Sequence, residues 1–350
     1  MKNLLKVARQ NKGLMIRELA QLVGIDQALI SKFESGSRKP TLAQLGTLAQ
    51  ILDLNYKELK IQWLKEKILY ELQEEDWALE ALQVAEQEIK SKLQQKRELE
   101  VPHSLSDLIQ SINELQKKLQ SLRQFDSYRI AQSLELEYTF ESNRIEGNTL
   151  TLMETDLVIN EGLTISGKSM REHLEAINHR DAIVFMKQLA EKNTNLIERD
   201  VLSLHQLVLK GIDYSNAGKY RNVQVLIKGS SYTPPAPYIV PKQMEDFFIW
   251  YKQNRKKLHP IILAAEMHER LVTIHPFIDG NGRTSRLLMN LILLQHGFVI
   301  ANIKGDNSSR LAYYTALEEV QTNGNKIPFL NFVAQVEYDA LERYLKVLGS

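Results

Sequence analysis

Apolar residues recur at helical spacing through nearly all of the 350-residue sequence, and this periodicity most restricts the fold. Strand-like patterns occur at residues 224–227 and near residues 238–240. No internal repeat of about 20–50 residues is present. We therefore predict a mainly α-helical protein, of two or three domains at roughly 100–200 residues each.

The composition excludes several classes of protein. Hydrophobic residues make up 43% and charged residues 25%, as in ordinary globular proteins. With 44 Lys and Arg against 43 Asp and Glu, the net charge is +1, which excludes a strongly basic chain but not a local basic patch. The absence of cysteine excludes disulfides, zinc fingers, iron–sulfur clusters and thiol catalysis. Without a signal core or an apolar stretch of about 20 residues, we expect a cytoplasmic protein that binds no membrane.

The sequence divides into three regions that differ in composition and in helical pattern. Residues 1–60 carry short helical patterns interrupted by Gly and Pro, and residues 61–125 contain no glycine. Val101-Pro102 interrupts the long helical pattern, so we predict a helical linker at residues 61–102 and a third region at residues 103–350. A coiled-coil dimer stem is the alternative for the linker, although its apolar register is not a sustained heptad.

The first region predicts a small DNA-binding module. Gly24 and Gly36 are placed to end helices, and Asp26 is a good N-cap for a helix over residues 27–35. Residues 2–39 hold eight basic against three acidic side chains, a net charge of +5 that favours phosphates. The side chains of the third helix that are suited to bases and phosphates are Gln27, Ser31 and Lys32.

The run RELAQLVGIDQALISKFESGSRKPTLAQLGTLAQIL resembles the Cro/C1-type (Xre) repressor family. The resemblance implies a five-helix helix-turn-helix domain that binds DNA through residues 1–60. A module that only binds protein or dimerises is the alternative, because this fold does not determine function.

Residues 274–290, IHPFIDGNGRTSRLLMN, predict an anion site. His275 precedes a proline and ends a helix, and residues 279–282 form a glycine-rich turn into the next helix. The free N–H groups of that helix N-terminus attract anions, and Arg283 and Arg286, three residues apart, suggest a di- or triphosphate. Asp279 is a hard oxygen ligand suited to Mg²⁺, and His275 is placed as a general base.

The core HPFIDGNGR, followed three residues later by Arg286, resembles the complete signature of the Fic-domain family. The resemblance covers about residues 103–345 and implies an all-helical Fic fold with a β-hairpin flap and a catalytic core at about residues 200–345. It also implies protein AMPylation, in which AMP passes from ATP to a Ser, Thr or Tyr hydroxyl of a target protein, or of the chain itself, and pyrophosphate leaves.

The same resemblance implies a role for each residue of the signature. His275 would deprotonate the hydroxyl, and Asp279 would hold Mg²⁺ (or Mn²⁺). The backbone of Gly280, Asn281 and Gly282 would form the anion hole. Arg283 would contact the β-phosphate and Arg286 the γ-phosphate.

Two further segments match the family. Residues 221–240 resemble its flap, for which a plain surface hairpin is the alternative, and such a flap can pair with an extended target segment. Tyr313 and Tyr314 match positions that line the nucleotide pocket in relatives. Adjacent aromatics on a helix usually divide between core and surface, so we assign the adenine contact to Tyr314.

Ser142, Glu146 and Gly147, in the run SNRIEGN, resemble the family's inhibitory motif at the end of a helix of about residues 130–147. Glu146 would then pair with Arg286 in a bidentate contact and keep it from the γ-phosphate. The alternative is that Glu146 only ends a helix before Gly147.

Two other functions stay open at this stage. One is a transcription regulator whose Fic fold only senses nucleotide, although a sensor needs no base such as His275. The other is a hydrolase that removes AMP from its target, or a Fic enzyme that uses another nucleotide. Homodimerisation is expected from the relatives of both modules.

Overall fold

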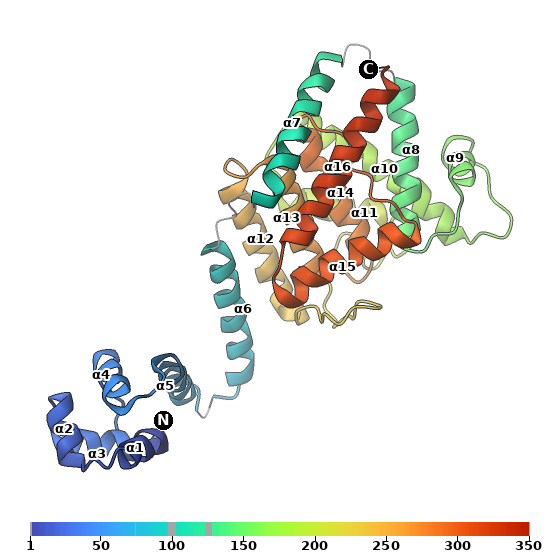
Figure 1. Cartoon of the computed structure of the whole chain (residues 1–350). Helices are drawn as coiled ribbons and strands as arrows, with labels where there is room; N and C mark the ends of the chain where they lie inside the picture. The colour runs from blue at the N-terminus through green and yellow to red at the C-terminus, as the bar shows by residue number, and fades with distance from the viewer. Residues whose placement is uncertain (1, 74, 97–102, 123–127, 350) are drawn as a thin grey trace. The chain divides into compact units, whose positions relative to one another are not determined.

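The computed structural model describes residues 2–73, 75–96, 103–122 and 128–349. It divides into two compact units, residues 1–93 and residues 94–350 (Figure 1). The predicted break at Val101-Pro102 lies outside the described residues. None of the helices in the described ranges is long and apolar enough to cross a membrane.

The helix ends predicted at Gly24, Asp26 and Gly36 in the N-terminal unit are confirmed. Asp26 accepts a hydrogen bond from the Ala28 N–H (2.7 Å), and Gly24 and Gly36 cap the preceding helix and this one in the left-handed conformation. The helices are α1 (Lys2–Asn11), α2 (Ile16–Val23), α3 (Gln27–Ser35), α4 (Leu42–Leu52), α5 (Tyr56–Glu71) and α6 (Ala78–Lys96), the last of which runs past residue 93.

The first five helices enclose one apolar core, to which Leu5, Ile30 and Phe33 contribute fully buried side chains. Helix α5 continues past residue 60, and Trp63 packs against this core. The Trp63 indole N–H also donates to the Pro40 carbonyl (2.9 Å). Residues beyond 60 therefore take part in the helix-turn-helix unit.

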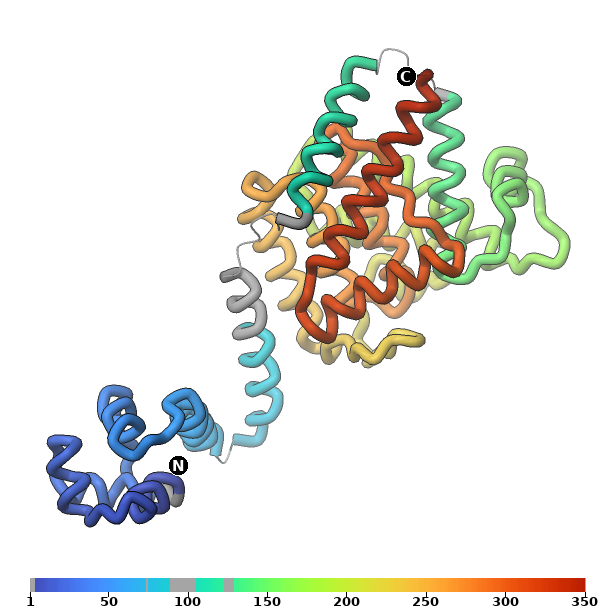
Figure 2. The backbone as a smooth tube through the Cα atoms, viewed as in Figure 1, coloured from blue at the N-terminus to red at the C-terminus, as the bar shows by residue number. Residues whose placement is uncertain are grey.

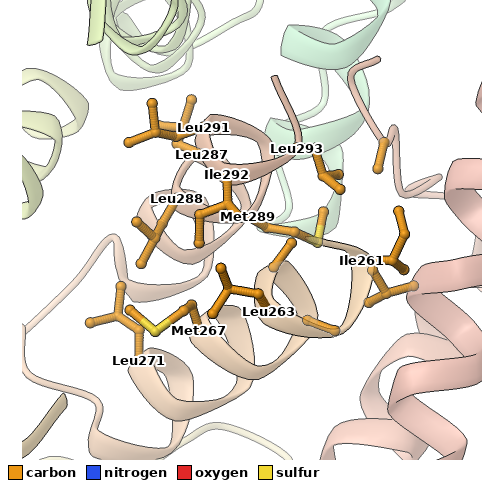
Figure 3. Close-up of a cluster of buried hydrophobic side chains, with 14 of the residues drawn as sticks. Ile261, Leu263, Met267, Leu271, Leu287, Leu288, Met289, Leu291, Ile292 and Leu293 are labelled. Carbon is orange, nitrogen blue, oxygen red and sulfur yellow. The ribbon is translucent and has the colours of Figure 1, made fainter. Parts of the chain in front are cut away.

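The C-terminal unit is built around two helices that contact each other closely, α13 and α14 (Figure 1). Figure 3 shows apolar side chains of the two helices facing each other, with Met267 and Leu271 opposite Leu288. Helix α7 lies beside α16 along the edge of the unit (Figure 2). The elements are α7 (His103–Leu122), α8 (Tyr128–Ile145), α9 (Leu152–Asn160), α10 (Met170–Lys192), α11 (Glu198–Val208), η2 (Pro237–Ile239), α12 (Val240–Asn254), α13 (Pro260–Ile274), α14 (Asn281–Gln295), α15 (Asn307–Asn323) and α16 (Ile327–Val347).

Helix α14 is buried on all its sides. Its residues from Arg283 to Leu293 are buried without exception, which is typical of a helix in the centre of a core. Buried together with its leucines are Arg283, Arg286 and Asn290, which are polar or charged. Burying such groups is costly unless they are paired, so the helices around α14 must supply partners.

The predicted strands are wrong. Residues 221–236 are a loop with a turn at Gly229, and the described residues contain no strand, so the expected hairpin lacks a β-ladder. Residues 237–239 form the short helix η2 and Val240 begins α12. The reason is local, because Pro234, Pro235 and Pro237 have no N–H to donate to a partner strand.

The N-terminal unit also contains a buried ion pair. Arg9 on α1 donates to both carboxylate oxygens of Glu34 on α3, at 2.6 and 3.0 Å, and to the Leu14 carbonyl. Both side chains are less than a tenth exposed. The hydrogen bond to Glu34, stronger than the opposing effect of burial, raises the pKa of the Arg9 guanidinium.

We predict that Arg9→Met lowers the free energy of unfolding of the N-terminal unit by about 3–5 kcal/mol, because it leaves the Glu34 carboxylate buried without its partner. The double variant Arg9→Met/Glu34→Leu should recover most of the loss. Thermal unfolding of the full chain measures this, with the exposed Arg38→Met as the control. A double variant no more stable than Arg9→Met would contradict the prediction.

Candidate active site

The glycine-rich turn between α13 and α14 has the predicted form. His275 ends α13 in a left-handed conformation (φ 50°), and Gly280, also left-handed (φ 78°), is the N-cap of α14. The helix begins at Asn281, two residues before the predicted start. The Asn281 side chain accepts from the Phe277 N–H and donates to the Phe277 carbonyl, at 3.0 and 2.9 Å. Its side chain therefore holds the turn through both its oxygen and its nitrogen.

His275 is in a state suited to accepting a proton. Its Nδ1 lies 3.2 Å from the Val272 carbonyl and donates to it, so Nε2 is the unprotonated nitrogen of the neutral ring. Burial lowers the pKa of the imidazole, and nearby Arg221 acts in the same direction. The ring is therefore neutral near pH 7, as a general base must be.

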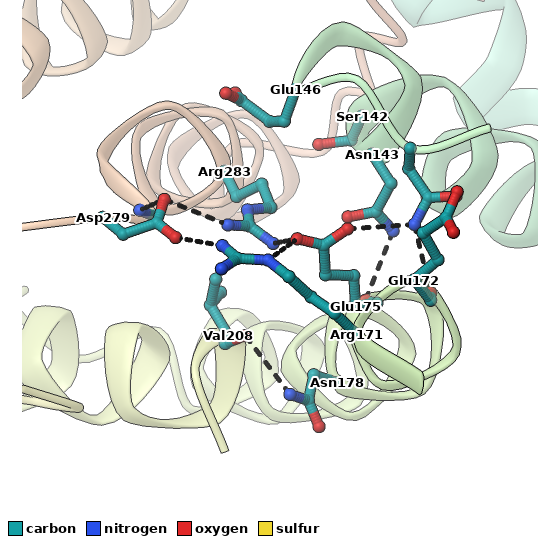
Figure 4. A network of polar contacts seen from close by, with 12 residues as sticks. Ser142, Asn143, Glu146, Arg171, Glu172, Glu175, Asn178, Val208, Asp279 and Arg283 are labelled. Atoms are coloured by element: carbon teal, nitrogen blue, oxygen red, sulfur yellow. Dashed lines mark hydrogen bonds and ion pairs between the residues drawn. The ribbon is translucent and has the colours of Figure 1, made fainter. Parts of the chain in front are cut away.

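Arg283, which is 2% exposed, lies in a network of alternating charges (Figure 4). It pairs with Glu175 (Nη1–Oε1, 3.2 Å) and with Asp279 (Nη2–Oδ1, 3.3 Å). Arg171 contacts both of these carboxylates from α10. Although burial favours protonation of Asp279, Arg283 and the Gly280 N–H keep the pKa of the carboxyl below its usual value.

Arg286 is 1% exposed and is held by the end of α8. It donates to the Ser142 hydroxyl (3.0 Å), to the Ser142 carbonyl (2.8 Å) and to Glu146 Oε1 (2.7 Å). Burial alone would lower the pKa of the guanidinium, but Glu146 reverses the effect and raises it. The contact uses one oxygen of Glu146, so the predicted bidentate geometry is wrong. Ser142 accepts from Nε and Nη2, and among the described residues Nη1 has no hydrogen-bond acceptor.

The Glu146 carboxylate lies over the N-terminus of α14. A Cβ placed on Gly282 would be 2.3 Å from Glu146 Oε1 and 3.1 Å from Arg286 Nη1. Gly147 follows α8 with φ 97°, a conformation that favours glycine and turns the chain away. The space that the turn and Arg286 offer to an anion is thus occupied by a carboxylate of the same chain.

The two adjacent tyrosines of α15 divide as predicted. Tyr313 is buried and contacts His268 (OH to Nε2, 3.0 Å), whereas Tyr314 is 44% exposed. The Tyr314 hydroxyl donates to the carbonyl of Ile145, the last residue of α8 (3.3 Å). Tyr314 thus lies beside Glu146, and its contact with adenine stays a prediction.

Four residues that sequence reasoning missed complete the site: Arg171, Glu175, His205 and Arg221. The His205 ring stacks on Phe277 (3.6 Å between centroids) and its Nε2 donates to the Asp279 carbonyl (2.9 Å). The Arg221 Nε donates to the His275 carbonyl (2.8 Å). Arg171 and Glu175 lie on α10, His205 on α11 and Arg221 in the loop before η2, all far in sequence from the residues 275–286 that they surround.

The site fits a divalent cation held jointly with phosphates. Asp279 is ionised and partly exposed, but the described residues contain no group of three or more His, Asp or Glu side chains that could hold a metal alone. Mg²⁺ typically takes one or two carboxylates and completes its shell with waters and phosphate oxygens. Asp279 is suited to that role.

A cavity of about 630 Å³ lies elsewhere in this unit, and none of the signature residues lines it. Apolar side chains such as Leu134, Phe298 and Phe332 form its wall. It therefore takes no part in the arrangement around His275.

On the N-terminal unit, Gln27, Ser31 and Lys32 are all exposed on α3. Ile30 and Phe33 of the same helix are buried in the core, so the three predicted DNA contacts share the outward face. The exposed basic residues Lys6, Arg17 and Arg38 belong to the same unit.

The fold and the site together define a Fic-type domain. Residues 195–293 match the sequence model of the Fic/DOC family, and residues 5–59 match that of the helix-turn-helix family. The chain therefore contains a Fic/DOC domain and a helix-turn-helix domain.

Among its relatives is a protein adenylyltransferase Fic from Nematostella vectensis, 35% identical over 243 residues, which are 68% of this chain and 56% of that protein. The chain spans about half the length of the curated relatives that it matches. A Fic domain containing signaling protein from Bacteroides thetaiotaomicron has a similar structure (TM-score 0.62, 28% identity, 68% of this chain and 97% of that one). Fic-1 from C. elegans is similar too (TM-score 0.62, 25% identity, 99% and 97%).

Buried neutral histidines predict that this unit loses stability in mild acid. Burial lowers the pKa of His205 to about 4, whereas the unfolded chain takes up that proton near its ordinary pKa of about 6.5. As pH falls from about 6.5 to 4, the unfolded state alone gains the proton, so stability falls, by about 3 kcal/mol for this group. Thermal unfolding between about pH 4.5 and 7.5 should show the decline. His205→Gln should make the decline less steep, and an unchanged slope would contradict the assignment.

Proposed function

We propose that this chain is an autoinhibited protein adenylyltransferase joined to a DNA-binding module. In this proposal it transfers AMP from ATP to a Ser, Thr or Tyr hydroxyl of a target protein, or of the chain itself. The observation that carries it is a neutral histidine beside a glycine-rich helix N-terminus with two buried arginines. Relatives named protein adenylyltransferase Fic support it.

The proposed reaction exchanges one bond at the α-phosphorus of ATP. The target oxygen bonds to the α-phosphorus while the bond to the β-phosphate oxygen breaks, and pyrophosphate leaves with that electron pair. The hydroxyl proton passes to Nε2 of His275. Arg283, Arg286 and the N–H groups at the start of α14 neutralise the developing charge on the phosphates.

In this proposal Asp279 would hold Mg²⁺ or Mn²⁺ together with the nucleotide. When bound, the cation adds positive charge beside the phosphate oxygens. The role of this chain is to keep Asp279 ionised, which Arg283 and the Gly280 N–H do by lowering its pKa.

In this proposal, inhibition arises because the Glu146 carboxylate and a phosphate of ATP compete for Arg286. Glu146 pairs with Arg286 and lies over Gly282, where a phosphate would otherwise bind. ATP that binds beside Glu146 would have its phosphates displaced, and a misplacement of about 1 Å can cost on the order of 10²-fold in rate.

We expect Glu146→Gly to raise self-modification with labelled ATP by on the order of 10²-fold, because Arg286 becomes free for the γ-phosphate. Adding His275→Ala should abolish the labelling, since the hydroxyl loses its base. Electrophoresis of the full chain after incubation with α-labelled ATP measures both.

Each rival function has its own outcome in this assay. Labelling that survives His275→Ala would exclude His275 as the base, and transfer from CTP, GTP or UTP but not ATP would exclude adenylyl transfer. Nucleotide binding without transfer would favour the sensor, and release of AMP from modified protein would favour the hydrolase. Homodimerisation and a cytoplasmic location stay predictions.

We also propose that the N-terminal unit binds DNA through the outward face of α3. Gln27 and Ser31 are suited to base edges and Lys32 to a phosphate, and exposed Lys6, Arg17 and Arg38 add positive charge to the same unit. The match to the helix-turn-helix family supports this proposal.

We expect the full chain to bind a fragment containing its own promoter with an affinity that falls steeply as salt rises. Lys32→Ala should weaken binding to all sequences and reduce the salt slope by about one, whereas Gln27→Ala should relax specificity by about 1–3 kcal/mol. Lys57→Ala, an exposed change on α5, is the control. Binding that is absent or independent of salt across a genomic fragment pool would contradict the proposal.

A further inference from the structure

Asp279, the carboxylate suited to a metal, is already paired with arginine side chains. Asp279 Oδ1 accepts from the Gly280 N–H (2.6 Å) and from Arg283 (3.3 Å). Asp279 Oδ2 accepts a short hydrogen bond from Arg171 Nη2. Both oxygens are thus engaged, and a cation that binds Asp279 must replace one of these contacts.

Arg171 is the partner that can leave. Its side chain is 56% exposed, whereas that of Arg283 is 2% exposed and enclosed by the core. Its Nε stays 3.2 Å from Glu175 Oε1, on the same helix one turn later. Glu175 pairs with Arg283 as well, so Arg171 and Arg283 both keep a carboxylate partner when Asp279 binds a cation.

The first turn of α10, which carries Arg171, is fastened to the chain just after Glu146. Glu172 accepts from the backbone N–H of Thr149 (2.9 Å) and from its hydroxyl (2.5 Å). Asn148 donates to the Glu172 carbonyl (3.1 Å) and to Glu175 Oε2 (3.0 Å). Hydrogen bonds from Thr149 and from Ser169 lower the pKa of Glu172 to about 2, so this carboxylate stays ionised at ordinary pH.

The chain after α8 and the first turn of α10, joined by these hydrogen bonds, therefore bring a negative and a positive side chain to the site. Glu146 reaches Arg286 at one end, and Arg171 reaches Asp279 at the other. Figure 4 shows Arg171 between Asp279 and Glu175, with Glu146 on the far side of α14 from them.

We propose that Arg171 is a positioning residue that neutralises Asp279 while no metal is bound, and that the divalent cation must displace it. Arg171 then sets how strongly nucleotide binding depends on metal. Without metal its charge attracts the phosphates, and with metal it competes for Asp279. The inference rests on the proposed function only in taking Asp279 as the metal ligand of a nucleotide site.

The test is titration calorimetry of the full chain with α,β-methylene ATP, whose α–β linkage cannot be cleaved, in Mg²⁺ and in EDTA. The background is Glu146→Gly, so that the anion site is open. We expect Arg171→Gln to tighten binding in Mg²⁺ by about two- to fivefold, since the cation no longer breaks an exposed ion pair. In EDTA the same change should leave affinity equal or weaker.

The controls separate the possible failures. Arg180→Gln removes a cation from the same helix outside this network and should leave the ratio of the two affinities unchanged. Arg171→Gln that weakens binding equally in Mg²⁺ and EDTA would show a merely structural role and overturn the inference. Asp279→Asn should abolish the gain from Mg²⁺. If no variant binds the nucleotide, the proposed function fails. If the variants bind it but Arg171→Gln leaves the ratio of the affinities in Mg²⁺ and EDTA unchanged, only this inference is refuted.

Discussion

Two guanidinium groups inside a helical core are the constraint on which the site depends. Arg283 and Arg286 stand on α14, which is buried on all sides, and they are 2% and 1% exposed. A buried charge costs several kcal/mol unless it is paired and hydrogen-bonded. Helix α10 supplies Glu175 and the turn supplies Asp279, whereas α8 supplies Ser142 and the turn after α8 supplies Glu146. The segments around α14 thus supply acidic and polar partners as well as apolar packing.

The need to pair the buried Arg286 applies both to the structure described and to the proposed nucleotide-bound form. Arg286 needs an anion near it whether or not nucleotide is bound, and Glu146 meets that need at 2.7 Å. A γ-phosphate would meet it equally well, with more charge and more acceptor oxygens. In the proposed function, the inhibitory Glu146 is therefore an alternative partner for the buried Arg286 guanidinium. Removing Glu146 leaves Arg286 in need of an anion, so nucleotide binding would itself stabilise the released form.

The sequence predicted what local chemistry determines. Helix ends at Gly24, Asp26 and Gly36, and the turn before α14, follow from backbone preferences of a few adjacent residues. The pairing of Glu146 with Arg286 was predictable only through a family resemblance, since 140 residues separate them. Arg171 and His205 reach Asp279 from 108 and 74 residues away. Each looks like an ordinary helix residue, because only the packing of α10 and α11 brings it to the turn.

In the loop of residues 221–236, which was expected to be a hairpin, hydrogen bonds from one side chain take the place of a β-ladder. Arg221, 3% exposed, donates to the carbonyls of Val223 (3.0 Å) and Pro235 (2.6 Å), which lie on the two arms of the loop, and to that of His275. One guanidinium thus connects both arms to the histidine, where the prolines cannot donate. Its hydrogen-bond partners are neutral carbonyls, and burial lowers the pKa of the Arg221 guanidinium. That charge adds to the burial that keeps His275 neutral, so the residue that positions the loop also helps prepare the base.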